Sequence, residues 1–342
     1  MELTRTQSNK PSLAARTGLA LRGLVGMQEF AIIIAFFVAL AFFYWRNPAM
    51  LLPATVTSIL RTMAFPGLIG LGLVQLMIAG EIDLSTGAMM SLAAVFCAKL
   101  VRDVFLPMGF SGGEAVVAGV AIALAASLLV GLINSVLVVK IGIPAVIATI
   151  GMQFVVRGAS YSFTTGVPIY PLPPEMAILG SMRPLGVSFT FVLMLGLGLV
   201  VHILLTRTRW GASLFATGGN KMAAQVCGVN TDRVKFICFM LTSLLAGMAG
   251  ILTMSQMPQT PVDPIIGRFL DLDVLAGVVV GGVSLFGGRG SAIGTFFGVL
   301  FIQMVRSGIV VAHFDSYLQQ PVLGFMLVLG ASVDVLRHFR RA

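Results

Sequence analysis

The chain has 342 residues, of which 57% are hydrophobic and only 10% are charged. Soluble domains carry about 25% charged residues, so this composition indicates a protein embedded in a membrane. The net charge of +9 would suit a nucleic-acid ligand. Lys and Arg commonly mark the cytoplasmic loops of membrane proteins, however, and we expect no nucleic-acid partner.

Ten apolar runs approach the length of about 20 residues that crosses a bilayer as a helix. The five clearest runs are 30–45, 59–79, 115–139, 187–205 and 236–257. Five others are shorter or interrupted by polar residues, namely 84–100, 143–163, 270–286, 292–311 and 322–336. The sequence therefore predicts an all-α, polytopic integral membrane protein with about ten transmembrane helices, some of them short or broken.

We predict one membrane domain over residues 30–337, between cytoplasmic tails at 1–29 and 338–342. No cleavable signal peptide is expected, because the first 29 residues are polar and basic and no small-residue cleavage site follows the first apolar run. Both termini are expected in the cytoplasm, which carries the excess of basic loop residues. With ten spans, fourteen of the 22 basic residues then lie on that side: Arg5, Lys10, Arg16, Arg22, Lys140, Arg207, Arg209, Lys221, Arg233, Lys235, Arg289, Arg337, Arg340 and Arg341.

The first polar break between long apolar runs is AGEIDLSTG at 79–87. Acidic side chains are costly in hydrocarbon, so Asp83 requires a hydrogen-bonding partner or a polar environment. Asp83 or Ser85 capping a helix that starts near Leu84 is the favoured interpretation. The alternative is a helix broken at this point, whose capped end lines a polar cavity.

Other polar residues also fall within the apolar runs. Two spans carry Asn134, Thr149, Gln153 and Arg157. These side chains either face a cavity that suits a neutral, hydroxyl-rich solute or form hydrogen bonds between helices. Asp271 and Asp273 lie two residues apart and so do not share one helical face. A proton relay through them is disfavoured, because the other spans contain no chain of Asp, Glu or His.

Two proline-rich stretches, at 166–186 and 258–269, are expected outside the membrane as turns or as docking surfaces for an external partner. Glycines recur at four-residue spacing in two groups, 277 and 281 and then 290, 294 and 298, which favours close helix packing. The three cysteines have no metal-site spacing, and we expect neither a metal site nor a disulfide.

Residues 206–235 form the longest polar stretch between apolar spans and carry five basic residues. Within it, 220–228 is typical of two turns of helix. Asn220 suits the N-cap, Ala223 and Ala224 favour helix, and Gly228 suits a left-handed C-terminal position. Thr231 or Asp232 is the predicted cap of the next span. Met222 and Val226, four residues apart, form a small apolar face for docking.

Catalytic signatures are absent from the sequence: it has no phosphate loop, metalloprotease motif, nucleophile elbow or dinucleotide fingerprint. We therefore predict that the chain is not an enzyme and binds no cofactor. If transport is active, another chain must hydrolyse the nucleotide or an ion gradient must be used.

Four ordered motifs together resemble the permeases of ABC importers for ribose and other monosaccharides. They are AGEIDLSTGAMMSLAAV (79–95), GLINSVLVVKIGIPAVIATIGM (131–152), ATGGNKMAAQVCGVNTDRVK (216–235) and LDLDVLAGVVVGGVSLFGGRGSAIGT (270–295). The resemblance covers most of the chain from about residue 59 onward. Glu81 departs from the glycine that is usual there in the family, which bears on substrate choice.

The resemblance implies a subunit in a bacterial cytoplasmic membrane that carries a sugar or polyol inward. It implies a second permease copy or paralogue, an external solute-binding protein, and a cytoplasmic ATP-binding subunit that uses ATP and Mg²⁺. Residues proposed to couple to this ATPase are Gly218, Gly219, Asn220, Lys221, Met222, Ala223, Ala224, Val226 and Gly228. Candidate residues of the translocation pathway are Asp83, Ser85, Asn134, Thr149, Gln153 and Asp273.

Two alternatives stay open at this point. One is a secondary transporter of a small polar solute that is driven by protons or sodium, in which Asp83, Asp271 and Asp273 bind the ion. The other is a membrane scaffold that transports nothing.

Overall fold

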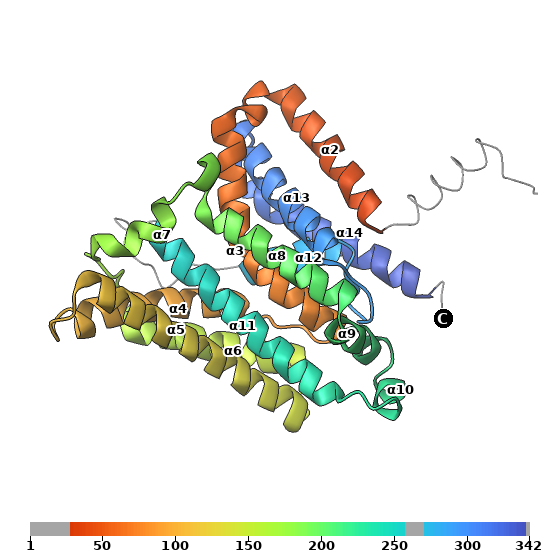
Figure 1. Cartoon of the computed structure of the whole chain (residues 1–342). Coiled ribbons are helices and arrows are strands. Elements are labelled where there is room, and N and C mark those ends of the chain that lie inside the picture. The colour runs from red at the N-terminus through yellow and green to blue at the C-terminus, as the bar shows by residue number, and fades with distance from the viewer. Residues whose placement is uncertain (1–27, 257–269, 340–342) are drawn as a thin grey trace, which may run out of the picture.

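The computed structural model describes residues 28–256 and 270–339, and these fold into a bundle of helices (Figure 1). Ten helices correspond one to one with the predicted apolar runs. They are α2 (Gln28–Arg46), α3 (Pro53–Ile78), α4 (Thr86–Lys99), α5 (Gly112–Ser135), α6 (Ala145–Thr164), α8 (Phe189–Arg207), α11 (Thr231–Gln256), α12 (Leu270–Val280), α13 (Ala292–Val311) and α14 (Gln319–Phe339). The prediction of an all-α polytopic fold is confirmed.

Six of the helical segments in the described residues are long and apolar enough to cross a membrane. The helix α12 has only 11 residues, and α4 has 14. At 1.5 Å per residue, α12 is about 17 Å long, well short of a hydrocarbon layer of roughly 30 Å. The expectation that some spans are short or broken therefore fits these two helices. Residues 100–105 and 136–140 extend α4 and α5 in π-helical geometry.

The core of the bundle is built around α3 and α11. Every residue of α3 from Pro66 to Ile78 is buried, and Phe239 on α11 is fully buried. Helices farther out expose large apolar side chains, such as Val117 on α5, Phe154 on α6 and Val328 on α14. Such faces suit contact with lipid chains, as expected for a membrane-embedded bundle.

The glycine stripe brings α12 and α13 into backbone contact. A Cβ atom at Gly281 would collide with the carbonyl oxygen of Gly294, and one at Gly298 with that of Gly277. No larger side chain fits at these positions without moving a helix, so the predicted role of the stripe in close packing is confirmed.

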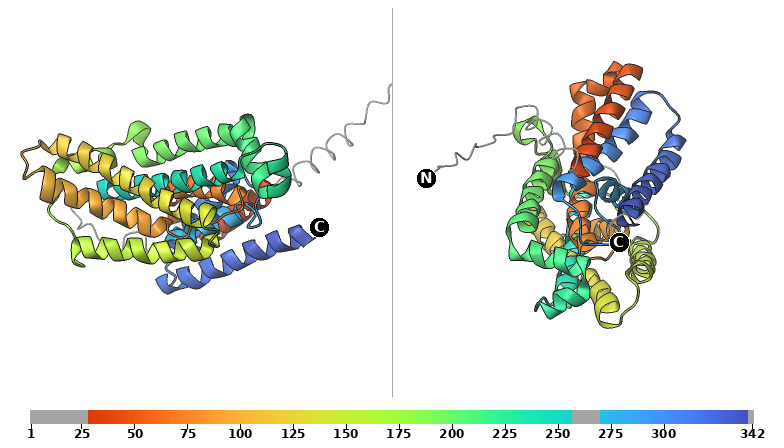
Figure 2. Two further views of the ribbon diagram at one scale, coloured as in Figure 1. Left: turned by 90° about the horizontal axis from the view of Figure 1, so that it is seen from below. Right: turned by 90° about the vertical axis from the view of Figure 1, so that its right-hand side faces the viewer.

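The helices form a layered bundle whose connections lie at two opposite ends. The short helices α9 (Arg209–Gly219) and α10 (Lys221–Val226) lie at the same end as the end of α14 (Figures 1 and 2). The proline-rich stretch 166–186 lies at the other end and contains only single turns, including α7 (Ile178–Ser181). The other predicted external stretch, 258–269, and most of the N-terminal tail lie outside the described residues.

All three cysteines are free thiols. Cys97 and Cys238 are buried, whereas Cys227 is exposed in the segment that follows α10. No group of three or more potential metal-binding side chains occurs in the part of the chain that the structure describes.

Candidate functional site

The helix α10 is capped at both ends, as the sequence predicts. Asn220 precedes it, and the side-chain oxygen of Asn220 accepts a hydrogen bond from the backbone N–H of Ala223 at 3.0 Å. After the helix, Gly228 has a φ of +83°, a left-handed conformation that glycine adopts without steric cost. The predicted N-cap and C-terminal glycine are therefore confirmed.

The cap of α11 differs from the prediction of Thr231 or Asp232. The residue before both, Asn230, provides it: the side-chain oxygen of Asn230 accepts a hydrogen bond from the backbone N–H of Arg233 at 2.9 Å. Asn, Thr and Asp all suit an N-cap. The register of the first turn decides among adjacent candidates, and the sequence does not fix that register.

The helix α10 presents its apolar side chains outward. Met222 is 77% exposed and Val226 is 89% exposed, and their four-residue spacing places them on one face. Ala224 is only 4% exposed and packs against the rest of the chain. Because six residues of helix are not stable alone, the caps and the contact of Ala224 hold α10 in place. The face of Met222 and Val226 is left free.

Gly218, at the end of α9, makes backbone contact with two other segments. A Cβ atom there would collide with the carbonyl oxygen of Ile78 and lie 2.6 Å from the backbone nitrogen of Gly288. The N–H of Gly288 itself donates to the carbonyl of Ile78 at 2.8 Å. Gly219, by contrast, has open space around it. The ends of α3 and α9 and the loop 281–291 therefore meet as one junction.

Side-chain contacts also connect α10 to the start of α11. The amide of Gln225 donates to the hydroxyl of Thr231 at 3.0 Å. Lys221 pairs with Asp232 at 3.5 Å, although both side chains are about half exposed. These two contacts join α10 to the first turn of α11.

Glu81 forms an ion pair with Lys235 of α11, at 2.5 Å, with both side chains mostly buried. This ion pair joins the segment between α3 and α4 to α11. The side chain of Glu81 thus contacts α11 close to α10, a contact that the sequence does not show.

Residues 79–85 interrupt helical structure between α3 and α4. The favoured capping interpretation is wrong, because α4 begins at Thr86 and the side chain of Ser85 accepts no hydrogen bond from its first turn. Asp83 instead accepts hydrogen bonds from the N–H and the hydroxyl of Ser85, at 2.8 and 2.6 Å. The carboxylate therefore stabilises the turn before α4. Helical structure is interrupted here, as in the alternative interpretation, and the polar cavity of that interpretation stays a prediction.

Four of the six candidate pathway residues come together at this break. Asn134 on α5 donates to the hydroxyl of Ser85 at 3.0 Å and to the carboxylate of Asp83 at 3.3 Å. Thr149 on α6 accepts from the N–H of Leu84 at 3.1 Å. Asp83, Ser85, Asn134 and Thr149 are each at most 1% exposed. In this conformation Asp83, Ser85 and Asn134 bind one another, and Thr149 binds the backbone beside them. Their contact with a solute stays a prediction.

The remaining candidates, Gln153 and Asp273, have other partners. The amide of Gln153 donates to Asp271 at 2.7 Å, and Asp273 pairs with Arg306 on α13 at 2.7 Å. The two aspartates thus point to different helices, as their two-residue spacing predicts. Arg306 was not among the predicted site residues, although a single basic residue inside an apolar run is a signal of a paired or functional group.

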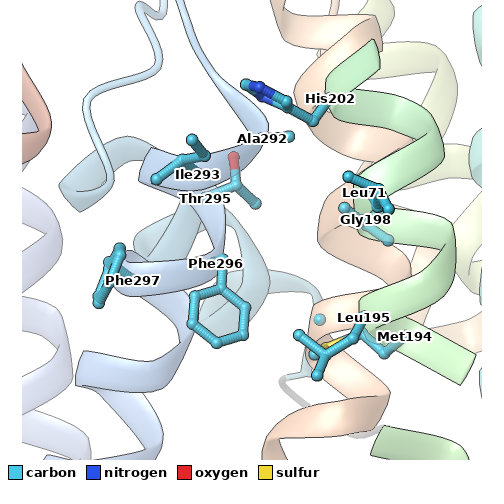
Figure 3. Close-up of a pocket in the computed structure, with 12 residues that line it drawn as sticks. Leu71, Met194, Leu195, Gly198, His202, Ala292, Ile293, Thr295, Phe296 and Phe297 are labelled. Carbon is cyan, nitrogen blue, oxygen red and sulfur yellow. The ribbon is translucent and has the colours of Figure 1, made fainter. Parts of the chain in front are cut away.

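An apolar cavity of about 320 Å³ lies between α3, α8 and α13 (Figure 3). Its surface offers few polar groups, so it suits a lipid chain better than a hydroxylated solute. None of the candidate pathway residues lines it. The lining residues are Gly67, Leu71, Met194, Leu195, Gly198, Leu199, His202, Ala292, Ile293, Thr295, Phe296 and Phe297.

Comparison with known proteins identifies similar permeases. The family model for the permease component of branched-chain amino acid transport systems matches residues 55–331. The ribose import permease protein RbsC of Escherichia coli (strain K12) is 30% identical over 312 residues, which cover 90% of this chain and 94% of that protein.

Two further relatives carry other names. The autoinducer 2 import system permease protein LsrC of Photorhabdus luminescens is 30% identical over 274 residues, 80% of each chain. The xylose/arabinose import permease protein XylH of Sulfolobus acidocaldarius is 28% identical over 313 residues, 92% of this chain and 85% of that protein. No solved structure matches the chain.

Proposed function

This chain belongs to the family of permease components of branched-chain amino acid transport systems, and we propose that the solute it carries is a sugar or a polyol. It is a membrane permease subunit of an importer and not an enzyme. The family description names amino acids, whereas the relatives described above are named for ribose, for xylose and arabinose, and for autoinducer 2. Their similarity along nearly the whole chain supports the sugar class.

In importers of this family a separate subunit hydrolyses ATP, and we infer that α10 is the element that contacts it. The single observation that carries this proposal is the exposure of Met222 and Val226, at 77% and 89%. Apolar side chains that a capped helix holds outward suit a groove on a partner protein. In this proposal ATP and Mg²⁺ bind to the ATPase, and this chain binds no cofactor.

Two sets of contacts connect α10 to the membrane helices and would transmit its movement. One runs through Gln225 and Thr231 into α11, and from there through the ion pair of Lys235 with Glu81 to the break after α3. The other runs through α9, where Gly218 touches the backbone at the end of α3. Since packed helices shift as units, closure of the ATPases on ATP would move α3 and α11 together and alternate access to the pathway.

Partners on both sides of the membrane complete the proposed assembly. In this proposal the end of the bundle that carries the basic residues of 206–235 faces the cytoplasm, and both termini lie on that side. The stretch 166–186, at the other end, then faces an external solute-binding protein. A second copy or a paralogue of this permease forms the other half of the membrane domain.

Uptake by vesicles tests the proposal. The chain is reconstituted with its ATPase and its solute-binding protein, and uptake of labelled ribose, xylose and arabinose is measured with ATP inside. We expect uptake that stops when ATP is depleted and persists when a protonophore and sodium removal abolish the ion gradients. Uptake that collapses with the gradients while ATP remains would instead support the ion-driven alternative through Asp83, Asp271 and Asp273.

A further inference from the structure

A polar groove of about 510 Å³ lies at the end of the bundle opposite α10, between the start of α3, the second half of α13 and the start of α14. Sites for small molecules typically have volumes of roughly 300–1,000 Å³. Seven of its ten lining residues carry a hydroxyl, amide or guanidinium group, and they are Thr55, Ser58, Thr62, Gln303, Arg306, Ser307 and Gln319.

The groove lies within the depth of the membrane. Near the C-terminal end of α3, Gln75 accepts a hydrogen bond from the indole N–H of Trp210 at 3.1 Å. Tryptophan commonly marks the membrane interface. At 1.5 Å per residue, Thr62 is about 20 Å and Ser58 about 26 Å farther along α3. Both distances fall inside a hydrocarbon layer of roughly 30 Å.

A polar surface at this depth does not suit contact with lipid chains. Ser58 and Thr62 are exposed, and the guanidinium side chain of Arg306 is 25% exposed. Polar and charged groups inside membranes usually face a water-filled cavity or a polar partner, because contact with hydrocarbon is costly. The polar groups of the groove therefore suit contact with water or with a polar solute.

Hydrogen-bonding groups in the groove lack partners. Gln303 is only 7% exposed, yet its amide has no hydrogen-bond partner among the described residues. The Nε of Arg306 is buried without a partner, while its Nη2 is held by both oxygens of Asp273. The amide of Gln303, which lines the groove, is therefore available to donate to and accept from a molecule bound there.

We propose that this groove is a contact site for the transported solute and that it takes a neutral, hydroxyl-rich molecule. The carboxylate of Asp273 neutralises Arg306, so this pair does not select an anion. A sugar hydroxyl both donates and accepts hydrogen bonds, and the amide of Gln303 and the hydroxyl of Ser58 offer both functions. The inference rests on the proposed function, because it assigns a site to that solute.

Transport kinetics test the site with Ser58→Ala and Gln303→Leu in the reconstituted importer. One hydrogen bond contributes about 0.5–1.5 kcal/mol, which corresponds to roughly a twofold to tenfold rise in KM for uptake. The rate of ATP hydrolysis stays unchanged, which shows that the complex is intact. Ser332→Ala, at an exposed serine of α14 outside the groove, is the matched control. Because Ser58 is exposed, its variant tests the site even if Gln303→Leu fails to fold.

A labelling experiment tests whether the groove is open to water. Ser58→Cys is treated with a membrane-impermeant maleimide from the side opposite α10, with Val155→Cys, 65% exposed on α6, as the lipid-facing control. The wild type, with exposed Cys227, gives the background. We expect Ser58→Cys to label, and ribose, xylose or arabinose to slow its labelling, while Val155→Cys stays unlabelled.

Two results would overturn the inference alone. One is labelling of Ser58→Cys no faster than that of Val155→Cys. The other is an unchanged KM in both groove variants while the wild type still takes up a sugar. A wild type that takes up no sugar contradicts the proposed solute class, and the groove assignment falls with it.

Discussion

The break at 79–85 and the segment 209–230 both interrupt a mostly apolar chain, but their side chains are partnered in opposite ways. At the break, Asp83 and Ser85 are almost completely buried and bind partners within the chain. In the segment, Met222 and Val226 are apolar and largely exposed. The polar groups of the first region have partners within the chain, whereas the second presents an apolar surface that no described part of the chain covers.

Because of this difference, variants in the two regions should affect different properties, namely the stability of the permease and its binding to the ATPase. Removing a partner from a buried polar group costs the fold about 1–3 kcal/mol. Changing an exposed side chain usually alters stability by less than about 0.5 kcal/mol. Variants at the break should therefore destabilise the permease itself, and variants on the exposed face of α10 should weaken its complex with the ATPase.

The largest expected effect is on that complex. Burying a Val or Met side chain fully is worth about 1.5–3 kcal/mol, so Met222→Glu with Val226→Glu should lower the affinity for the ATPase at least tenfold. Thermal stability of the isolated permease should not change. Co-purification measures the complex, and Tyr317→Glu, at an 86% exposed residue of the opposite end, is the control. A double variant that still retains the ATPase would contradict the assignment.

The second prediction concerns the buried cluster at 79–85, which Asn134→Leu should destabilise. This substitution removes the donor to Ser85 and Asp83, and we expect a loss of about 1–3 kcal/mol in the free energy of unfolding. Thermal unfolding in detergent measures this loss, with Ser332→Ala as the control. An unchanged midpoint would show that the buried cluster does not stabilise the break.

The ion pair of Glu81 with Lys235 connects the two regions. A double-mutant cycle with Glu81→Gln and Lys235→Met should give a coupling of about 1–2 kcal/mol to the free energy of unfolding. The exposed pair of Lys221 with Asp232 is the matched control, with roughly 0.2–1 kcal/mol expected. Equal coupling in both cycles would mean that burial does not strengthen the link at Glu81.

The smallest expected effect comes from the cap of α10. Asn220→Ala should cost this helix about 1 kcal/mol, which loosens α10 without unfolding the permease. ATP-driven uptake should fall several-fold, and Asn220→Asp, which keeps a good capping group, should restore it. If Asn220→Asp is as impaired as Asn220→Ala, the residue acts through something other than capping.

Local features of the sequence predicted much of the fold and part of the site. The ten helices follow from the apolar runs, because about 20 apolar residues suffice to specify a span. The caps of α10 follow from Asn220 and Gly228, because capping depends on neighbours in the chain. The two-residue spacing of Asp271 and Asp273 correctly separated their faces.

Two of the missed features depend on contacts between distant segments. The junction of Gly218 with Ile78 and Gly288 joins three connections that only the packed bundle brings together. The partner of Glu81 lies 154 residues away. Capping by Ser85 failed because the hydroxyl binds Asp83 and Asn134, a competition that local spacing does not reveal.

Photo-crosslinking from α10 tests the central claim most directly. A benzoylphenylalanine side chain is placed at Val226, at Met222 or, as a control, at Tyr317, and the assembled importer is irradiated. We predict that Val226 and Met222 crosslink to the ATPase subunit and that Tyr317 does not. An importer that hydrolyses ATP and transports its solute, yet forms no crosslink from either position of α10, would contradict the account.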